Sequence, residues 1–260
     1  MKNLLNAKLC CAFCLGALPI VPALGQTIAA PVISTTAALH GAVVVSLSTT
    51  TPGATIWYAT QDSYSLQRYD APFLVDSKTT LMARASVGTT WSSNTIKKLA
   101  IPKISPGTLV WEDEFSNSTG SIAEPNPNFW TYGTGTSGTT SFLGAGIQDY
   151  CAWNSSVSPC NPSEPNVFVN PHGGLAIVAQ NPSSGVYTAG QLTTQGLFSF
   201  QYGRIEVRAK VPEARGFWPA VWLLGNSIST VGWPACGEQD VLERIDAAGW
   251  PERPGRSLTY

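Results

Sequence analysis

Three carboxylates stand close together near the C-terminal end of the sequence. Glu238, Asp240 and Glu243 form the pattern E-x-D-x-x-E within six residues. Glycosidic bonds are cleaved by a pair of carboxyl groups, one acting as nucleophile or base and the other as acid. A third carboxylate between them can share a proton and separate the apparent pKa values of the pair. The pattern thus indicates glycosidase chemistry, with an acidic, solvent-facing edge strand as the alternative.

Strand geometry decides whether the three carboxylates can act together. Residues two apart in a strand point to one face, so Glu238 and Asp240 share a face and Glu243 is out of phase by one residue. A one-residue bulge at Val241-Leu242 would return Glu243 to that face. Bulges occur beside active sites, where they re-aim a side chain. We therefore predict a bulged strand with all three carboxylates on one face.

The composition of the chain favours short strands as the elements that hold this cluster. Only 12% of the 260 residues are charged, and the chain contains 24 Gly and 19 Pro. Such a length suggests one or two domains, and frequent turn residues favour short strands over a coiled coil or helical bundle. The net charge is −1 and there is no basic stripe, so nucleic acid is not an expected partner. The fold class that we predict is all-β.

Residues 1–25 have the character of a secretory signal peptide. Lys2 and Lys8 supply the basic region, and an apolar run follows from Leu9 to Ile20, which is short for a bilayer span. We therefore expect a secreted protein, extracellular or periplasmic, that is not held in a membrane. The C-x-x-C spacing of Cys11 and Cys14 falls in this removed segment, so it is not interpreted as a redox motif.

Three cysteines follow the signal segment. Cys151 and Cys160 flank a loop rich in Ser and Pro and could close a small disulfide in an oxidising compartment. Cys236 would then be unpaired, and an inert buried thiol is its simplest interpretation.

Residues 26–101 alternate short apolar runs with turn clusters and predict a small β-sandwich. The strands that we expect here are Val43–Ser48, Thr55–Ala59, Phe73–Val75, Thr80–Val87 and Thr95–Ala100. Trp57 and Trp91 could stack on sugars, but single aromatic residues in a small sandwich are more often core or edge residues. Residues 102–107, with two Pro and a Gly, predict a linker.

Residues 108–260 form a second region with a different pattern of expected strands and loops. Leu109–Phe115 predicts an opening strand and a turn, and a long loop region follows to about residue 166. The later strands that we expect are Val167–Val169, Leu175–Ala179, Gly203–Val211, Ala220–Leu224 and Glu238–Ile245.

Both regions resemble known families. Residues Val45–Thr60, Ala71–Phe73 and Lys78–Ala85 look like the immunoglobulin-like accessory domain of chitobiase-type proteins. The second resemblance rests on four motifs, WEDEF, GRIEVR, GFWPAVWLLG and GWPACGE, which begin at Trp111, Gly203, Gly216 and Gly232. They resemble the laminarinase-like branch of glycoside hydrolase family 16, whose members are endo-β-1,3-glucanases. This resemblance implies a concanavalin-like β-jelly-roll sandwich with the carboxylate strand on its concave face.

The second resemblance also implies residue roles. Glu238 matches the nucleophile, Asp240 the assisting acid and Glu243 the acid/base of a retaining enzyme, and the extra residue before Glu243 matches the bulged β-1,3-glucanase form. Trp218 and Trp233 match sugar platforms. Arg204 is a further candidate for substrate binding, although a surface ion pair with Glu206 is an equal alternative.

Two neighbours of the cluster are expected to be structural. Trp222 stands in an apolar run and is expected in the core. Gln239 occupies a position where the family has an apolar residue. There we expect it to face the core, where an unpaired amide costs about 1–3 kcal/mol.

The resemblance implies β-glucan as the polysaccharide substrate, no cofactor and a monomer. A structural Ca²⁺ site of the family kind is not supported here, and no metal ligands are assigned. Only 17 residues follow Glu243, so we expect a jelly-roll that is truncated at its C-terminal side. Three hypotheses therefore stand: a retaining β-1,3-glucanase, an inactive fragment of one, and a non-enzymatic carbohydrate-binding module.

Overall fold

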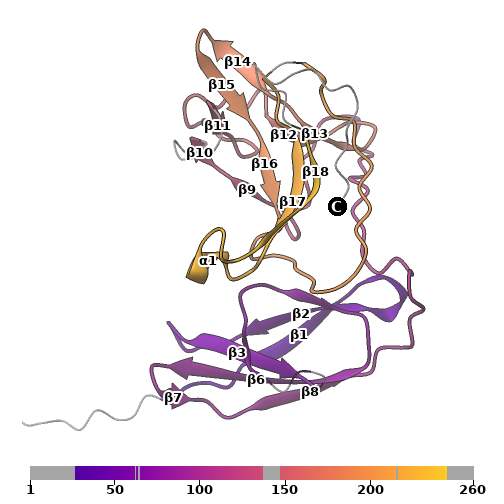
Figure 1. Ribbon diagram of the computed structural model, residues 1–260, viewed down its shortest axis with the longest axis vertical. Helices are drawn as coiled ribbons and strands as arrows, with labels where there is room; N and C mark the ends of the chain where they lie inside the picture. Colours follow the sequence, from indigo (N-terminus) through magenta and orange to yellow (C-terminus); the bar gives the residue numbers. More distant parts are fainter. Residues whose placement is uncertain (1–26, 62, 64, 137–146, 215, 245–260) are drawn as a thin grey trace, which may run out of the picture.

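The computed structural model describes residues 27–61, 63, 65–136, 147–214 and 216–244 (Figure 1). Strands dominate it, and the described helices are one 3-10 turn, Leu39–Gly41, and one four-residue turn, α1 (Ile228–Val231). The predicted all-β class is therefore confirmed. The predicted signal peptide lies outside the described residues. Among the described residues, no helix has the length and apolar character needed to cross a bilayer.

The N-terminal part is a sandwich of two antiparallel sheets. The first sheet has the order β1-β2-β5, from β1 (Val32–Ala37), β2 (Val43–Ser48) and β5 (Phe73–Val75). The second has the order β4-β3-β6-β7, with β8 also paired to β6. Its strands are β4 (Gln67–Arg68), β3 (Thr55–Thr60), β6 (Thr79–Val87), β7 (Thr90–Trp91) and β8 (Thr95–Leu99).

A hydrophobic core lies between these two sheets. Leu81, Ala83 and Ala85 of β6 are fully buried and alternate with partly exposed residues, as period-2 geometry requires. They pack with Val45 and Leu47 of β2. We call this unit, residues 27–101, the N-terminal sandwich.

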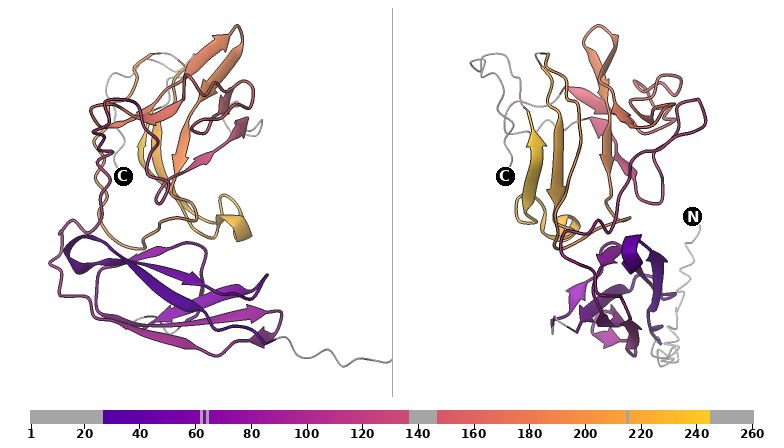
Figure 2. Two further views of the ribbon diagram at one scale, coloured as in Figure 1. Left: turned by 180° about the vertical axis from the view of Figure 1, so that it is seen from behind. Right: turned by 90° about the vertical axis from the view of Figure 1, so that its right-hand side faces the viewer.

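The second part contains four separate sheets among its described residues. The largest has the order β10-β11-β15-β14, and three strand pairs, β12-β13, β16-β9 and β17-β18, complete it. The strand bounds are β9 (Thr131–Gly133), β10 (Gly135–Thr136), β11 (Gln148–Tyr150), β12 (Val167–Val169), β13 (Leu175–Ile177), β14 (Gln180–Ser183), β15 (Val186–Ala189), β16 (Gln191–Thr193), β17 (Ala220–Leu224) and β18 (Glu238–Glu243). In Figure 2 the β17-β18 pair forms one side of this part.

Two expected strands are absent from the described structure. Residues 203–211 and 109–115 form no regular strand. Ile205 and Val207 are 37% and 49% exposed. A strand needs a ladder of hydrogen bonds to a neighbouring strand, and no described strand pairs with either segment. Apolar and polar residues do alternate in residues 203–211, but this alternation does not by itself provide a neighbouring strand.

Aromatic packing explains the W-E-D-E-F segment without a strand. Trp111 stacks on the buried ring of Phe198, with ring centroids 4.4 Å apart. Asp113 accepts hydrogen bonds from the backbone N–H of Phe115 (2.8 Å) and from Nε1 of Trp130 (2.7 Å). The segment is therefore a turn that is held by ring stacking and by hydrogen bonds to Asp113.

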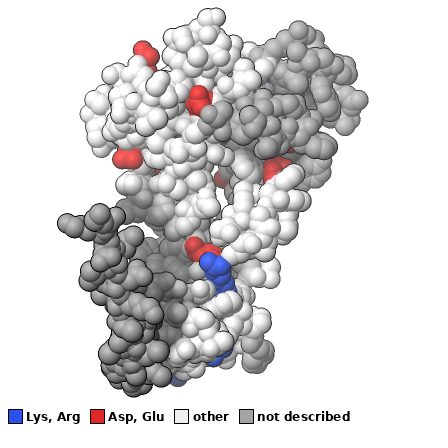
Figure 3. Space-filling view, turned by 90° about the vertical axis from the view of Figure 1, so that its left-hand side faces the viewer, with Lys and Arg blue, Asp and Glu red and all other residues white. Residues whose placement is uncertain are grey.

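The two parts touch through hydrogen bonds to backbone carbonyls. Leu74 of β5 donates its N–H to the carbonyl of Ser199 (2.9 Å), and Ser199 Oγ donates to the carbonyl of Pro72 (3.0 Å). Leu39 N–H donates to the carbonyl of Val110 (3.0 Å). Figure 3 shows a face on which acidic side chains are scattered over the second part and the few basic ones lie on the N-terminal sandwich.

Candidate active site

The carboxylate strand is β18, and it carries the predicted bulge. Its partner β17 runs antiparallel, and the register shifts between Val221, opposite Leu242, and Trp222, opposite Asp240. Val241 is therefore the extra residue of β18. A single inserted residue reverses the side-chain alternation from that point onward. The bulge predicted from the spacing is confirmed.

The register places all three carboxylates on one face. Glu238 lies opposite Leu224, Asp240 opposite Trp222, and Glu243 opposite Ala220. These β17 residues are two apart and share a face, and directly opposed residues in an antiparallel pair point the same way. We call the face that bears Glu238, Asp240 and Glu243 the carboxylate face.

Trp222 belongs to the carboxylate face, and the expectation that it lies in the core is wrong. It is 39% exposed and stands directly across from Asp240. The apolar run around it could not reveal this, because both faces of β17 bear apolar residues. Only the cross-strand register decides which of them joins the carboxylates.

Gln239 lies on the opposite face, beside Leu223, as the alternation predicts. It is exposed there, not buried in a core. The expected penalty for burying an unpaired amide is therefore not incurred in the described structure.

Two tryptophans hold the outer carboxylates through hydrogen bonds. Trp218 Nε1 donates to Glu243 Oε1 at 2.9 Å, and Trp233 Nε1 donates to Glu238 Oε2 at 2.5 Å. Hydrogen bonds to a charged acceptor are the stronger class in proteins. Trp218 and Trp233 are 43% and 64% exposed, so the indoles keep surface for a ligand while their N–H edges orient the carboxylates.

The loop that carries Trp233 is fixed against the end of β17. Gly225 N–H donates to the carbonyl of Gly237 (3.3 Å), and Cys236 N–H donates to the carbonyl of Gly232 (2.9 Å). A Cβ added at Gly225 would clash with the carbonyl oxygen of Cys236. This close backbone approach requires glycine at position 225.

Arg204 is not brought to the carboxylate face by any interaction seen among the described residues. It pairs with Glu206 at 2.7 Å, and the two side chains are 82% and 71% exposed. A pair this exposed contributes little to stability. Its role in substrate binding stays a prediction.

Cys151 and Cys160 form a disulfide that closes a loop of sequence separation 9. Cys236 is a free, half-buried thiol whose Sγ lies 3.4 Å from the carbonyl oxygen of Gly237. Among the described residues, no group of three or more Asp, Glu, His or Cys is arranged to hold a metal ion.

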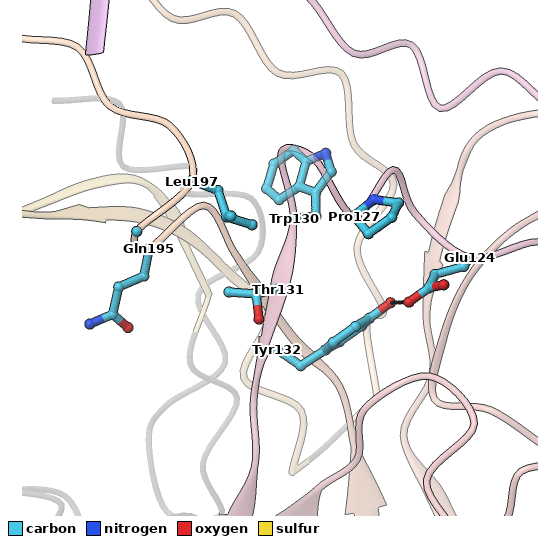
Figure 4. A pocket seen from close by; sticks show the side chains of 8 residues that line it. Glu124, Pro127, Trp130, Thr131, Tyr132, Gln195 and Leu197 are labelled. Carbon is cyan, nitrogen blue, oxygen red and sulfur yellow. Dashed lines mark hydrogen bonds between the residues drawn. The ribbon is translucent and has the colours of Figure 1, made fainter. Parts of the chain in front are cut away.

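A concavity of about 330 Å³ is lined by residues of segments other than β17 and β18 (Figure 4). Tyr132 and Glu124 line it, and the Tyr132 hydroxyl donates to Glu124 Oε1 at 3.5 Å. Burial and the neighbouring Glu124 carboxylate raise the pKa of Tyr132 above its ordinary value. A second concavity of about 420 Å³ adjoins Asp113 and shares Glu124. No pattern in the sequence indicated either one. Because none of the three carboxylates lines either concavity, we place the candidate active site on β18.

Comparisons with known proteins bear on this site. No family profile matches the chain. A keratan-sulfate endo-1,4-beta-galactosidase of Sphingobacterium multivorum is 33% identical over 141 residues, which are 53% of this chain and 29% of that protein. A glucan endo-1,3-beta-glucosidase A1 of Niallia circulans is 32% identical over 154 residues, or 55% of this chain and 20% of that protein. The chain is similar to glycoside hydrolases over about half of its length.

A further relative carries a binding name instead of an enzymatic one. A beta-1,3-glucan-binding protein of Penaeus monodon is 48% identical over 56 residues, which are 22% of this chain and 15% of that protein. The crystal structure of laminarinase from Flavobacterium sp. UMI-01 is 36% identical, with a TM-score of 0.43, and the match covers 54% of this chain and 53% of that one. The chain thus spans between 15% and 29% of the length of these three curated relatives.

Proposed function

We propose that this chain is a secreted retaining glycoside hydrolase that cleaves β-1,3-glucan. One observation carries the proposal: the Val241 bulge sets Glu238, Asp240 and Glu243 on one face, with a tryptophan N–H on each outer carboxylate. An acidic edge strand would need neither the bulge nor these two contacts. The glucanase names among the relatives support the substrate class.

The proposed reaction is a double displacement that needs no cofactor. A Glu238 oxygen attacks the anomeric carbon while protonated Glu243 gives its proton to the departing glycosidic oxygen. The glycosyl-enzyme ester is then hydrolysed by a water molecule that gives its proton to Glu243. The water oxygen forms the new bond to the anomeric carbon, and Glu238 leaves as a carboxylate.

Asp240 is the proposed assistant to both glutamates. It stands between them on the same face, opposite Trp222. A carboxyl group in this position can form a hydrogen bond with either glutamate during the reaction.

Trp218 and Trp233 are the proposed sugar platforms. Their indole edges are committed to Glu243 and Glu238, and each ring is partly exposed beside its carboxylate. A large flat apolar ring suits the C–H face of a pyranose. Trp222, directly opposite Asp240 on β17, extends this aromatic surface.

The remaining parts of the chain fit the same proposal. Residues 26–101 would be an immunoglobulin-like accessory module, residues 102–107 a linker, and residues 108–260 the catalytic region. Secretion is supported by the character of residues 1–25 and by the Cys151–Cys160 disulfide, because disulfides persist in oxidising compartments.

The test is sugar release from laminarin by the full chain and by three variants, Glu238→Gln, Asp240→Asn and Glu243→Gln. We expect Glu238→Gln to lower kcat by about 1,000-fold or more, because the amide has nearly the shape of the carboxylate but cannot act as the nucleophile. Glu164→Gln, an exposed glutamate away from β18, is the matched control and should keep full activity. Equal release by Glu238→Gln and the unmodified chain would contradict the assignment.

A non-catalytic β-glucan-binding protein is the second candidate. It is favoured by the 48% identity to the Penaeus monodon protein over 56 residues. It predicts retention of the chain on laminarin with no release of sugar, and it predicts that Glu238→Gln binds as well as the unmodified chain.

A further inference from the structure

The second sheet of the N-terminal sandwich carries two tryptophans and two arginines on its outer face. Trp57 of β3 lies opposite Arg68 of β4 and Arg84 of β6. Trp91 of β7 lies opposite Ser86, which is two residues from Arg84 and shares its face. The buried side chains of Ala83 and Ala85 point the other way, into the core. These outward residues therefore form one continuous surface, which we call the Trp-Arg face.

The rings on this face are in contact and partly exposed. Trp57 and Trp91 have ring centroids 6.1 Å apart with an interplanar angle of 54°. Trp91 is 41% exposed, and Trp57 Nε1 donates to Ser86 Oγ at 3.0 Å. The hydrogen bond fixes Trp57, and the sheet fixes both rings in a preformed arrangement.

Arg84 is held by a ring and not by an acceptor. Its guanidinium carbon lies 3.8 Å from the centroid of the Trp91 ring, a cation–π contact. Its Nε is buried without a hydrogen-bond partner, and among the described residues it makes no ion pair. Arg68, by contrast, is neutralised by Asp70 at 3.0 Å. The donors of Arg84 are thus fixed in place with no acceptor in the described part of the chain.

We propose that the Trp-Arg face is a second, non-catalytic site that binds a β-glucan chain. The ring surfaces suit the C–H faces of pyranose units. The Nη groups of Arg84 suit hydroxyl oxygens at the edge of the same sugars, whereas the buried Nε cannot reach a ligand. An exposed aromatic surface with oriented donors is the pattern of a polar-ligand site, since a core-filling Trp would be buried.

The position of the Trp-Arg face fits an anchoring role. Figure 1 shows β1 and β2 between the second part of the molecule and strands β3, β6 and β8. The two parts are joined at β5 through Ser199. A glucan chain on the Trp-Arg face would therefore hold the carboxylate face close to the same polysaccharide and raise its effective concentration. The choice of glucan as ligand rests on the proposed function.

The test is the binding of the full chain to insoluble β-1,3-glucan particles, measured by depletion from solution in a Glu238→Gln background. Trp91→Ala and Arg84→Lys should each weaken binding by about tenfold, because removal of an aromatic or arginine anchor has that effect at interfaces. Ile96→Ala, at a residue of the same outer face that is 65% exposed, is the matched control and should bind normally. Thermal unfolding of each variant checks the fold.

Hydrolysis of soluble laminarin, measured without the Glu238→Gln change, separates this proposal from the proposed function. Unchanged hydrolysis by Trp91→Ala together with lost particle binding supports the second site. Normal particle binding by both Trp91→Ala and Arg84→Lys overturns the second site. The two rings would then only shield the outer face of the sheet from solvent. Retention only on an acidic polysaccharide, lost in about 1 M salt, overturns the neutral glucan as ligand. If the unmodified chain does not hydrolyse laminarin but its particle binding still depends on Trp91, the proposed function is contradicted and the second binding site is supported.

Discussion

The indole N–H of Trp218 donates a hydrogen bond to Glu243, the residue to which we assign the acid/base role, with a distance of 2.9 Å. The two residues are 25 positions apart in the chain, and the β17–β18 pairing brings them together. On the other side of the carboxylate face, Trp233 holds Glu238 in the same way. Each outer carboxylate thus has one fixed donor and one partly exposed ring beside it.

Trp218→Phe should separate these two contributions. The phenyl ring keeps a stacking surface but removes the N–H that orients Glu243. A lost hydrogen bond to a neutral group is worth about 0.5–1.5 kcal/mol, so we expect kcat on laminarin to fall about 2- to 10-fold with a smaller change in KM. The measurement is steady-state kinetics over a range of pH. A change confined to KM would show that Trp218 only binds sugar.

Deletion of Val241 should remove the bulge without separating the carboxylates. The pattern then becomes Glu-x-Asp-x-Glu, in which the regular alternation of a strand leaves Glu243 on the face of Glu238 and Asp240. We therefore expect the deletion variant to keep laminarin hydrolysis. Val241→Ala keeps the residue count and is the matched control, for which we expect near-normal activity. Laminarin assays of both variants, with circular dichroism as a check of folding, give the result. Loss of hydrolysis in a folded deletion variant would contradict the claim that the bulge serves to keep Glu243 in phase with Glu238.

Gly225→Ala should displace the loop that carries Trp233. The new Cβ would meet the carbonyl oxygen of Cys236, and backbone must move to accommodate it. We expect a loss of about 1–3 kcal/mol in the free energy of unfolding and a raised KM. Urea denaturation and kinetics measure the two effects. Cys236→Ala leaves that carbonyl in place and serves as the control, with near-normal values expected.

Loss of the Cys151–Cys160 disulfide should destabilise the second part of the molecule. Closure of a loop with sequence separation 9 is worth about 2–3 kcal/mol in the chain-entropy treatment. The double variant Cys151→Ser/Cys160→Ser should therefore unfold at lower urea concentration. Reductant should lower the midpoint of the unmodified chain toward that of the variant. A midpoint insensitive to both changes would show that the disulfide contributes no stability.

Tyr132 should make the stability of the fold fall at alkaline pH. Burial and the Glu124 carboxylate raise the pKa of Tyr132 in the folded state above its ordinary value of 10.0. The folded state therefore holds this proton more tightly than the unfolded chain does, and stability is lost as the pH rises above about 10. Tyr132→Phe should flatten that loss in urea midpoints measured between pH 8 and pH 11. Tyr187→Phe, an exposed tyrosine on β15, should leave the curve of the unmodified chain unchanged.

Local pattern was enough to predict the strand with the three carboxylates. The spacing of Glu238, Asp240 and Glu243 fixes where a bulge must fall, because the alternation of a strand has only two phases. It was also enough for β2 and β5, whose bounds agree with the expected ranges. These are cases in which neighbours in the sequence carry the information.

Residues whose environment depends on a distant partner could not be predicted in this way. Trp222 stands in an apolar run, and only its register against Asp240 shows that it faces the carboxylates. Residues 203–211 alternate as a strand does but have no hydrogen-bonded neighbour among the described residues. The hydrogen bonds of Trp218 and Trp233 likewise depend on how β17, β18 and the loop between them fold together.

Azide rescue of two variants tests the central assignment most directly. With an activated aryl β-glucoside of laminaribiose as substrate, azide replaces the missing carboxylate or the missing base. Glu238→Ala should give the α-glycosyl azide, because azide attacks from the face that the nucleophile has vacated. Glu243→Ala should give the β-glycosyl azide, because the glycosyl-enzyme still forms on Glu238 and azide then opens it. Proton NMR distinguishes the two anomers. The opposite pairing, or no azide product from either variant, would contradict the roles assigned to Glu238 and Glu243.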